Sequence, residues 1–200
     1  LAGENENVLY TYKVQDPRRF GVAVTDENGR ILRLVEKPQE FVSDEAITGI
    51  YYIKEVKELR TALKYLMDHD VRTRGEFQLT DALQMMIDRG SKFRTAPMQE
   101  WLDCGLPETL VQTNAWLLQR VYGLNNISRV AIDQKDLIHN VKLIPPCIIG
   151  KNVSLENCTI GPNVTIGDNC VLKNVNIENS VVWNDEVVDN QTIQNRIVAN

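Results

Sequence analysis

Apolar and polar residues alternate along several short segments in the first half of the chain, which is the period of a half-buried β-strand. Asn28 and Gly29 lie between two of these segments and predict a hairpin turn, because both residue types tolerate a positive φ. The segments predicted as strands are residues 8–14, 20–25, 31–36, 47–53 and 92–98.

Three other segments repeat apolar residues at intervals of three and four, the period of an amphipathic helix. Gly90 follows the second of them as a C-terminal cap, and Pro107 suits the first turn of the third. The alternation of strands and helices predicts an α/β fold, but the order lacks the strand–glycine loop–helix that opens a doubly wound sheet. The predicted helices are residues 56–67, 79–87 and 110–121.

From Val141 onward the helical period disappears, and an aliphatic residue recurs every five or six positions. Internal repeats of this length predict a solenoid of short stacked strands, with the aliphatic side chains inside and Gly and Asn at the corners. Three sides of about six residues give a coil near 18 residues, so we expect about three coils in residues 144–200 after a linker at 122–143. The recurring residues are Ile149, Leu155, Ile160, Ile166, Leu172 and Ile177.

Composition narrows the classes of partner. The net charge is −5 and the pI is about 5.2, which argues against a nucleic-acid partner. No apolar run reaches the length of a membrane span, and no secretory signal is present, so we expect no membrane partner and a cytoplasmic location. The chain begins at Leu1 without a Met and a strand follows at once, so we expect a fragment of a longer protein.

The cysteines and histidines give no metal motif. Cys104, Cys147, Cys158 and Cys170 are separated by 43, 11 and 12 residues, which fits no common zinc pattern. We interpret all four as small buried apolar residues in a reducing compartment. With only two histidines, a histidine-rich metal site is excluded.

Two sets of motifs resemble known families. The tail from Ile148 to Asn169 resembles the hexapeptide repeat of left-handed parallel β-helices. Five motifs in the first part, taken in order, resemble the second half of a sugar-1-phosphate nucleotidyltransferase, closest to the glucose-1-phosphate thymidylyltransferases. They are Asp-Pro-Arg-Arg-Phe-Gly-Val at 16–22, Glu-Lys-Pro at 36–38, Thr-Gly-Ile-Tyr at 48–51, Arg-Gly-Glu-Phe-Gln-Leu-Thr-Asp at 74–81 and Trp-Leu-Asp-Cys-Gly at 101–105.

The resemblance implies a partial Rossmann-like mixed sheet in residues 1–121, the sugar-phosphate half of a catalytic domain, followed by a left-handed β-helix. The implied reaction joins a nucleoside triphosphate to a sugar 1-phosphate, with glucose 1-phosphate favoured, and releases pyrophosphate. The family's Gly-rich nucleotide loop and its mid-strand metal-binding Asp have no counterpart before Asp16. We therefore expect the nucleotide half to be missing and this chain alone to be inactive.

The resemblance also assigns roles to single residues. Lys37 would hold the sugar phosphate and Asp103 would bind Mg²⁺; the alternatives are a solvated strand-end lysine and a turn aspartate before a helix. Glu36 would accept hydrogen bonds from sugar hydroxyls, or would simply be a surface carboxylate paired with Lys37. Glu76 is interpreted as a helix cap, and Cys104 receives no chemistry. The other residues expected at the sugar phosphate are Gly21, Ile47, Gly49, Tyr51 and Arg74.

Two other functions stay open. A hexapeptide acyltransferase usually needs a histidine between coils, and His139 is expected to precede them. A non-catalytic regulatory or assembly module would keep the fold without turnover. We also expect a homo-oligomer, with Val181 and Val182 as exposed apolar residues on the solenoid.

Overall fold

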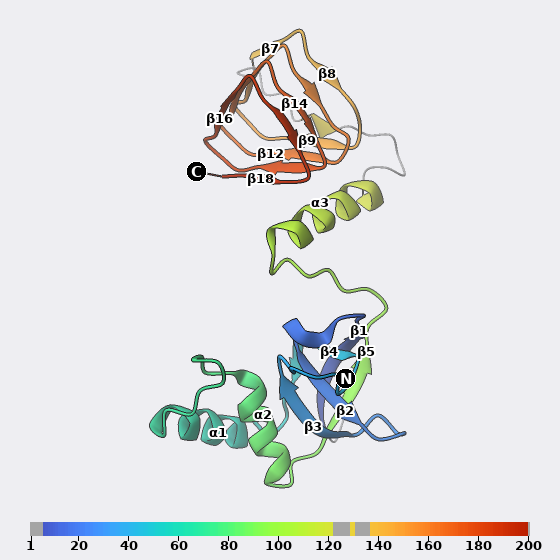
Figure 1. Cartoon of the computed structure of the whole chain (residues 1–200), viewed down its shortest axis with the longest axis vertical. Helices are drawn as coiled ribbons and strands as arrows, with labels where there is room; N and C mark the ends of the chain where they lie inside the picture. The colour runs from blue at the N-terminus through green and yellow to red at the C-terminus, as the bar shows by residue number, and fades with distance from the viewer. Residues whose placement is uncertain (1–5, 122–128, 131–136, 200) are drawn as a thin grey trace. The chain divides into compact units, whose positions relative to one another are not determined.

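The computed structural model describes residues 6–121, 129–130 and 137–199, which belong to two compact units, Leu1–Trp101 and Leu102–Asn200 (Figure 1). Both predicted parts are present, a mixed α/β sheet and a parallel β-solenoid. Among the helices of these residues, none is long and apolar enough to cross a membrane.

The first unit is built on a five-stranded sheet in the order β3-β2-β4-β1-β5. β1 and β5 pair in parallel and the other neighbours are antiparallel, so the sheet is mixed. The strands are β1 (Asn7–Lys13), β2 (Gly21–Thr25), β3 (Ile31–Glu36), β4 (Glu45–Tyr52) and β5 (Phe93–Pro97), with a 3₁₀ turn at Pro17–Arg19. The helices are α1 (Val56–Asp68) and α2 (Leu79–Asp88).

One hydrophobic cluster joins these elements. Leu83 and Met86 of α2 pack with Phe93 of β5 and Leu9 of β1, all almost fully buried. Burying such side chains stabilises the fold by roughly 2 kcal/mol each. Gly90 ends α2 in the left-handed region, with φ of 96°, as predicted.

The hairpin between β2 and β3 forms where predicted, but its turn is longer than a two-residue Asn-Gly turn. Asp26 Oδ1 accepts hydrogen bonds from the backbone N–H groups of Asn28 and Arg30, at 2.9 Å each. Gly29 has a φ of 76°, whereas Asn28 is not among the residues with a positive φ. An aspartate-capped turn closed by one left-handed glycine therefore replaces the expected pair of left-handed residues.

The second unit begins with α3 (Pro107–Val121) and continues as the solenoid. Three parallel sheets form its faces, in the orders β16-β13-β10-β7, β17-β14-β11-β8 and β18-β15-β12-β9-β6. The strands are β6 (Arg129–Val130), β7 (Leu137–His139), β8 (Lys142–Leu143), β9 (Cys147–Ile149), β10 (Ser154–Glu156), β11 (Thr159–Ile160), β12 (Val164–Ile166), β13 (Val171–Lys173), β14 (Asn176–Glu178), β15 (Ser180–Val182), β16 (Val187–Asp189), β17 (Thr192–Gln194) and β18 (Ile197–Val198).

The expectation of about three coils is wrong, because the solenoid has about four. β7 and β8 lie inside the segment expected to be a linker. Ile138 pairs with Leu155, and Leu143 pairs with Ile160, each 17 residues later. The aliphatic period therefore starts earlier than predicted, and α3, expected in the first domain, belongs to the second unit.

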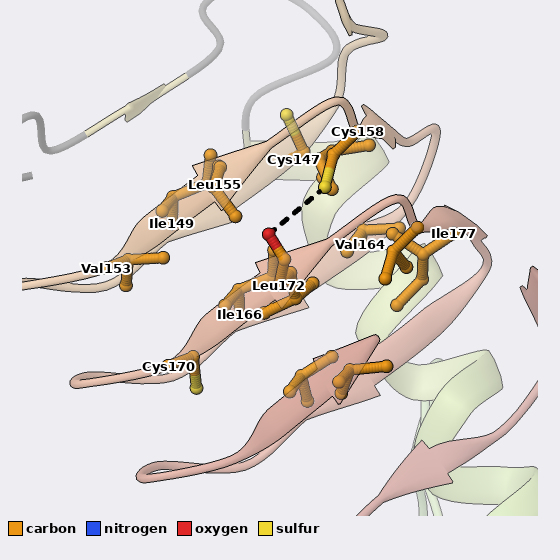
Figure 2. Close-up of a cluster of buried hydrophobic side chains, with 14 of the residues drawn as sticks. Cys147, Ile149, Val153, Leu155, Cys158, Val164, Ile166, Cys170, Leu172 and Ile177 are labelled. Atoms are coloured by element: carbon orange, nitrogen blue, oxygen red, sulfur yellow. Dashed lines mark hydrogen bonds between the residues drawn. The ribbon is translucent and has the colours of Figure 1, made fainter. Parts of the chain in front are cut away.

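Aliphatic side chains and three cysteines fill the interior of the solenoid (Figure 2). Leu155 and Leu172 are in register on neighbouring coils, as are Ile149 and Ile166, and all four are almost fully buried. Cys158 Sγ donates to the Leu172 carbonyl at 3.4 Å, which satisfies this buried thiol. This arrangement agrees with a left-handed β-helix tail.

Asparagine provides most of the left-handed corners, together with Asp185 and Gly161. Asn157 has a φ of 51°; its side chain accepts from Asn140 at 2.8 Å and donates to Asn174 at 3.2 Å, so that stacked corners form an amide ladder. Gly150 and Gly167 do not have a positive φ. A Cβ on Gly150 would lie 2.6 Å from the Gly167 carbonyl carbon one coil away, so close packing requires this glycine.

Candidate functional site

The candidate site in the first unit is built around Glu36, the last residue of β3. Gly21 pairs with Glu36 across the hairpin, and a Cβ on Gly21 would lie 2.8 Å from Glu36 Oε2. The same Cβ would lie 2.9 Å from Thr80 Oγ1. Gly21 therefore leaves room for a carboxylate and a hydroxyl beside the strand.

Thr80 holds the Glu36 carboxylate in place. Its hydroxyl donates to Glu36 Oε2 at 2.7 Å, and the Glu36 side chain is only 10% exposed. A hydrogen bond to a charged acceptor is stronger than one between neutral groups. Sequence reasoning assigned no role to Thr80, although it lies within the 74–81 motif, because only the fold brings the first turn of α2 to the end of β3.

Lys37 follows in a left-handed backbone conformation, with φ of 43°. Its N–H donates to the Phe20 carbonyl at 2.9 Å, which fixes this conformation. Its ammonium Nζ lies 4.0 Å from Glu36 Oε1 and 3.8 Å from Glu76 Oε2, and the side chain is 33% exposed. Lys37 is thus paired with Glu36, and solvent reaches the ammonium.

Arg74 reaches the same place from a tight turn before α2. Thr73 and Glu76 exchange two backbone hydrogen bonds, of 3.0 and 3.2 Å, around Arg74 and Gly75, both of which have a positive φ. Arg74 Nη2 donates to the Lys37 carbonyl at 2.7 Å. The turn therefore brings a second cation beside Lys37.

Glu76 is not the helix cap that the sequence suggested. The residue at the N-cap of α2 is Gln78, and no side chain caps that end. Glu76 instead pairs with Lys37 and accepts from Gln78 Nε2 at 3.0 Å.

Three β4 residues were expected at the site, and they differ in how closely they approach it. Ile47 is buried, and its Cδ1 would lie 3.4 Å from a Cβ on Gly21. Burial, and secondarily the negative charge of Glu36, raises the pKa of Tyr51, whose side chain is partly exposed. Gly49 has a φ of 85° and a Cβ there would meet no atom within 4 Å, so close packing does not require this glycine.

Asp103 belongs to the second unit, Leu102–Asn200. Its Oδ1 accepts the Gly105 N–H at 3.0 Å, and its carbonyl accepts from Thr113 Oγ1 at 3.3 Å. It therefore forms the turn before α3. Among residues 6–121, 129–130 and 137–199, no three His, Cys, Asp or Glu side chains gather as a metal site, so Asp103 is not part of a three-ligand cluster there.

Several smaller expectations need correction. Cys104 is exposed, whereas Cys147, Cys158 and Cys170 are buried, and burial raises the pKa of the Cys147 and Cys170 thiols. Val182, expected on the surface, is 1% exposed because it packs inside the solenoid.

His139 also differs from its expected position. It lies in β7, inside a coil rather than before the coils, and pairs in register with Glu156.

Comparisons with known proteins agree with the motifs. The family model described as nucleotidyl transferase matches residues 2–120. A glucose-1-phosphate thymidylyltransferase of Streptomyces antibioticus is 30% identical over 153 residues, which are 72% of this chain and 41% of that protein. The protein of the same description in Neisseria gonorrhoeae is 31% identical over 128 residues, which are 63% of this chain and 42% of its own length.

A further relative is a bifunctional sugar-1-phosphate nucleotidylyltransferase/acetyltransferase of Sulfurisphaera tokodaii. It is 27% identical over 153 residues, covering 76% of this chain and 35% of that protein. The chain thus spans less than half the length of each of these relatives.

Proposed function

Because the chain belongs to the nucleotidyl transferase family, we propose that its first unit binds the sugar 1-phosphate in a nucleotidyltransferase reaction. The observation that carries this proposal is the pair of cations, Lys37 and Arg74, beside the buried and hydrogen-bonded carboxylate of Glu36. Cations suit the phosphate, and a fixed carboxylate suits the hydroxyls of a sugar. One cluster therefore offers partners for both halves of a sugar phosphate.

In the proposed reaction a sugar 1-phosphate oxygen attacks the α-phosphorus of a nucleoside triphosphate. A new P–O bond forms, the bond to the β-phosphate oxygen breaks, and pyrophosphate leaves. Lys37 offsets the repulsion between the two anions, and Arg74 fixes the Lys37 backbone while adding positive charge. Glu36 orients the sugar, with Gly21, Ile47 and Tyr51 around it.

The metal in this proposal is Mg²⁺. Its preferred ligands are one or two carboxylates together with phosphate oxygens and water, and Asp103 offers one hard oxygen ligand. When bound, the ion would neutralise phosphate charge. The role of Asp103 in the chain itself is to hold the turn before α3 through Gly105.

The proposed substrates are glucose 1-phosphate and a thymidine or uridine triphosphate, supported by the descriptions of the relatives. The triphosphate would be bound by the Gly-rich loop of the family, which this sequence lacks, so we propose that this chain alone releases no pyrophosphate. We also propose a cytoplasmic homo-oligomer that associates through the solenoid, where Trp183 and Val187 are exposed.

The test of this function is a titration of the 200-residue chain with glucose 1-phosphate, glucose and inorganic phosphate, followed by calorimetry. The proposal expects glucose 1-phosphate to bind more tightly than either part alone. Equal binding of glucose 1-phosphate and inorganic phosphate would remove the role of Glu36 in sugar recognition. Light scattering of the same sample tests the oligomer, which a monomeric mass at micromolar concentration would refute.

A second candidate function is acyl transfer by the solenoid. The position of His139 within a coil favours it, since a histidine between coils is the base that such enzymes need. The Sulfurisphaera relative carries an acetyltransferase in its description. Acetyl transfer from acetyl-CoA to a sugar phosphate, lost in His139→Ala, would support this function, and its absence in the wild type would remove it.

A further inference from the structure

The Lys37 ammonium lies between two carboxylates that differ in their freedom to move. Glu36 Oε1 is 4.0 Å away, and its side chain is 10% exposed and held by Thr80. Glu76 Oε2 is 3.8 Å away, and its side chain is 70% exposed. Of these two partners, therefore, only Glu76 can withdraw into solvent without breaking a buried hydrogen bond.

The turn that carries Glu76 is itself fixed in place. Thr73 Oγ1 donates to Asp81 Oδ2 at 2.6 Å, and Arg74 Nη2 donates to the Lys37 carbonyl at 2.7 Å. The backbone at Glu76 is thus held near Lys37 while its side chain extends into solvent. Withdrawal of the Glu76 carboxylate requires a change of side-chain rotamer and the exchange of one exposed hydrogen bond, that from Gln78 Nε2, for water.

The local charges also balance. Lys37 and Arg74 contribute two positive charges, and Glu36 and Glu76 contribute two negative charges, so the cluster is formally neutral. An anion that binds Lys37 meets the negative charge of Glu76 at the same ammonium. Two negative groups beside one ammonium repel each other, so the anion and Glu76 compete for Lys37.

We propose that Glu76 is a resting counter-ion of Lys37 that an incoming sugar phosphate displaces. This inference rests on the proposed sugar-1-phosphate site. Inorganic phosphate gains only the charge of Lys37 and Arg74, whereas a sugar phosphate also gains the contacts of Glu36. Both anions displace Glu76 from the same ammonium, so its competition lowers both affinities by a similar factor.

The expected effect is modest, because exposed ion pairs are weak. Glu76→Gln should tighten the binding of inorganic phosphate by about three- to fivefold at low ionic strength. The binding of glucose 1-phosphate should tighten by a similar factor, because it displaces the same counter-ion. The difference from wild type should shrink as salt is added, because screening weakens the competition.

The experiment is calorimetric titration of the full 200-residue chain with inorganic phosphate and with glucose 1-phosphate. Glu27→Gln is the matched control, because it removes the same charge from the turn at the opposite end of the β2–β3 hairpin. The double variant Lys37→Ala, Glu76→Gln should not show the tighter anion binding of Glu76→Gln. Glu76→Ser is a second variant that removes the carboxylate, should Glu76→Gln fold poorly.

The outcomes separate the two proposals. If glucose 1-phosphate binds to wild type and loses affinity in Lys37→Ala, but Glu76→Gln and Glu76→Ser change neither affinity, the counter-ion role is wrong and the site stands. If Lys37→Ala leaves glucose 1-phosphate binding unchanged, the proposed site fails and the counter-ion role fails with it. A gain in Glu76→Gln that is absent in Glu27→Gln and lost with Lys37 supports both.

Discussion

The hydroxyl of Thr80 donates a 2.7 Å hydrogen bond to Glu36 Oε2 across 44 residues of sequence, from the first turn of α2 to the last residue of β3. Both side chains are largely buried. This bond leaves the other carboxylate oxygen of Glu36 facing Lys37. The position of the Glu36 carboxylate thus depends on how the helix packs on the sheet.

Replacing Thr80 by Val, which keeps its shape, should leave a buried carboxylate oxygen without its donor. We expect a loss of about 1–3 kcal/mol in the free energy of unfolding, measured by urea denaturation. Thr61→Val is the control, because the Thr61 hydroxyl bonds an exposed helix carbonyl, that of Lys57. Equal losses in the two variants would show that Glu36 does not depend on Thr80.

Gly21→Ala should weaken glucose 1-phosphate binding by about tenfold or more, because its Cβ would displace Glu36 and Thr80. Gly90→Ala makes the contrasting control. There the φ is 96° and the space is open, so only stability should fall, by about 1 kcal/mol. Calorimetric titration and thermal unfolding of both variants separate the two effects, and unchanged binding in Gly21→Ala would contradict the site geometry.

The Glu36 charge should also be visible in the titration of Tyr51. Burial and that charge raise the pKa of Tyr51, so the neutral phenol is favoured in the folded state. The contribution of Tyr51 to stability is therefore full below its unfolded pKa, near 10, and is lost as the pH rises through its folded value. Glu36→Gln should lower the pKa of Tyr51 only in part, since burial is the larger cause.

The pH titration is followed by absorbance, with Glu36 intact and in Glu36→Gln. In each case the curve of the matching Tyr51→Phe variant is subtracted, which isolates this tyrosine from the other five. A Tyr51 pKa that does not respond to Glu36→Gln would place the two groups too far apart to share a ligand.

The hydrogen bonds between stacked asparagines at the solenoid corners should contribute to stability, and two variants of Asn157 test this. Asn157→Ala loses two exposed amide bonds and places alanine, which tolerates the left-handed region less well than asparagine, at a φ of 51°, so we expect a loss of about 1–3 kcal/mol. Asn157→Gly loses the same bonds without the backbone cost and should be less destabilising by about 1 kcal/mol. Urea denaturation of both variants gives the comparison, and a glycine variant as unstable as the alanine variant would contradict it.

The sequence allowed the main elements to be predicted because their patterns are local. The aliphatic period of the solenoid, the Gly90 cap and the start of α3 at Pro107 all follow from neighbouring residues. The coil count was too low because Ile138 and Leu143 lie in a polar stretch, where the 17-residue period is recognised only against Leu155 and Ile160.

The sequence motifs predicted some residues of the candidate site and missed the contacts that join the others to it. Lys37, Glu36 and Arg74 lie together as the family resemblance implies, but Thr80 and Glu76 join them through contacts between distant segments. The turn at Thr73–Glu76 places Arg74 and Glu76 against Lys37 through its backbone conformation. Such a relationship between a turn and a strand end leaves no periodic signal in the sequence.

The role of Lys37 as the sugar-phosphate ligand is tested by nuclear magnetic resonance titration of the 200-residue chain with glucose 1-phosphate, which detects even millimolar binding. We predict amide shifts confined to the ends of β2 and β3 and the turn before α2, with affinity reduced at least tenfold in Lys37→Ala and unchanged in Lys57→Ala on exposed α1. Shifts that are absent in wild type, or that persist undiminished in Lys37→Ala, would contradict it.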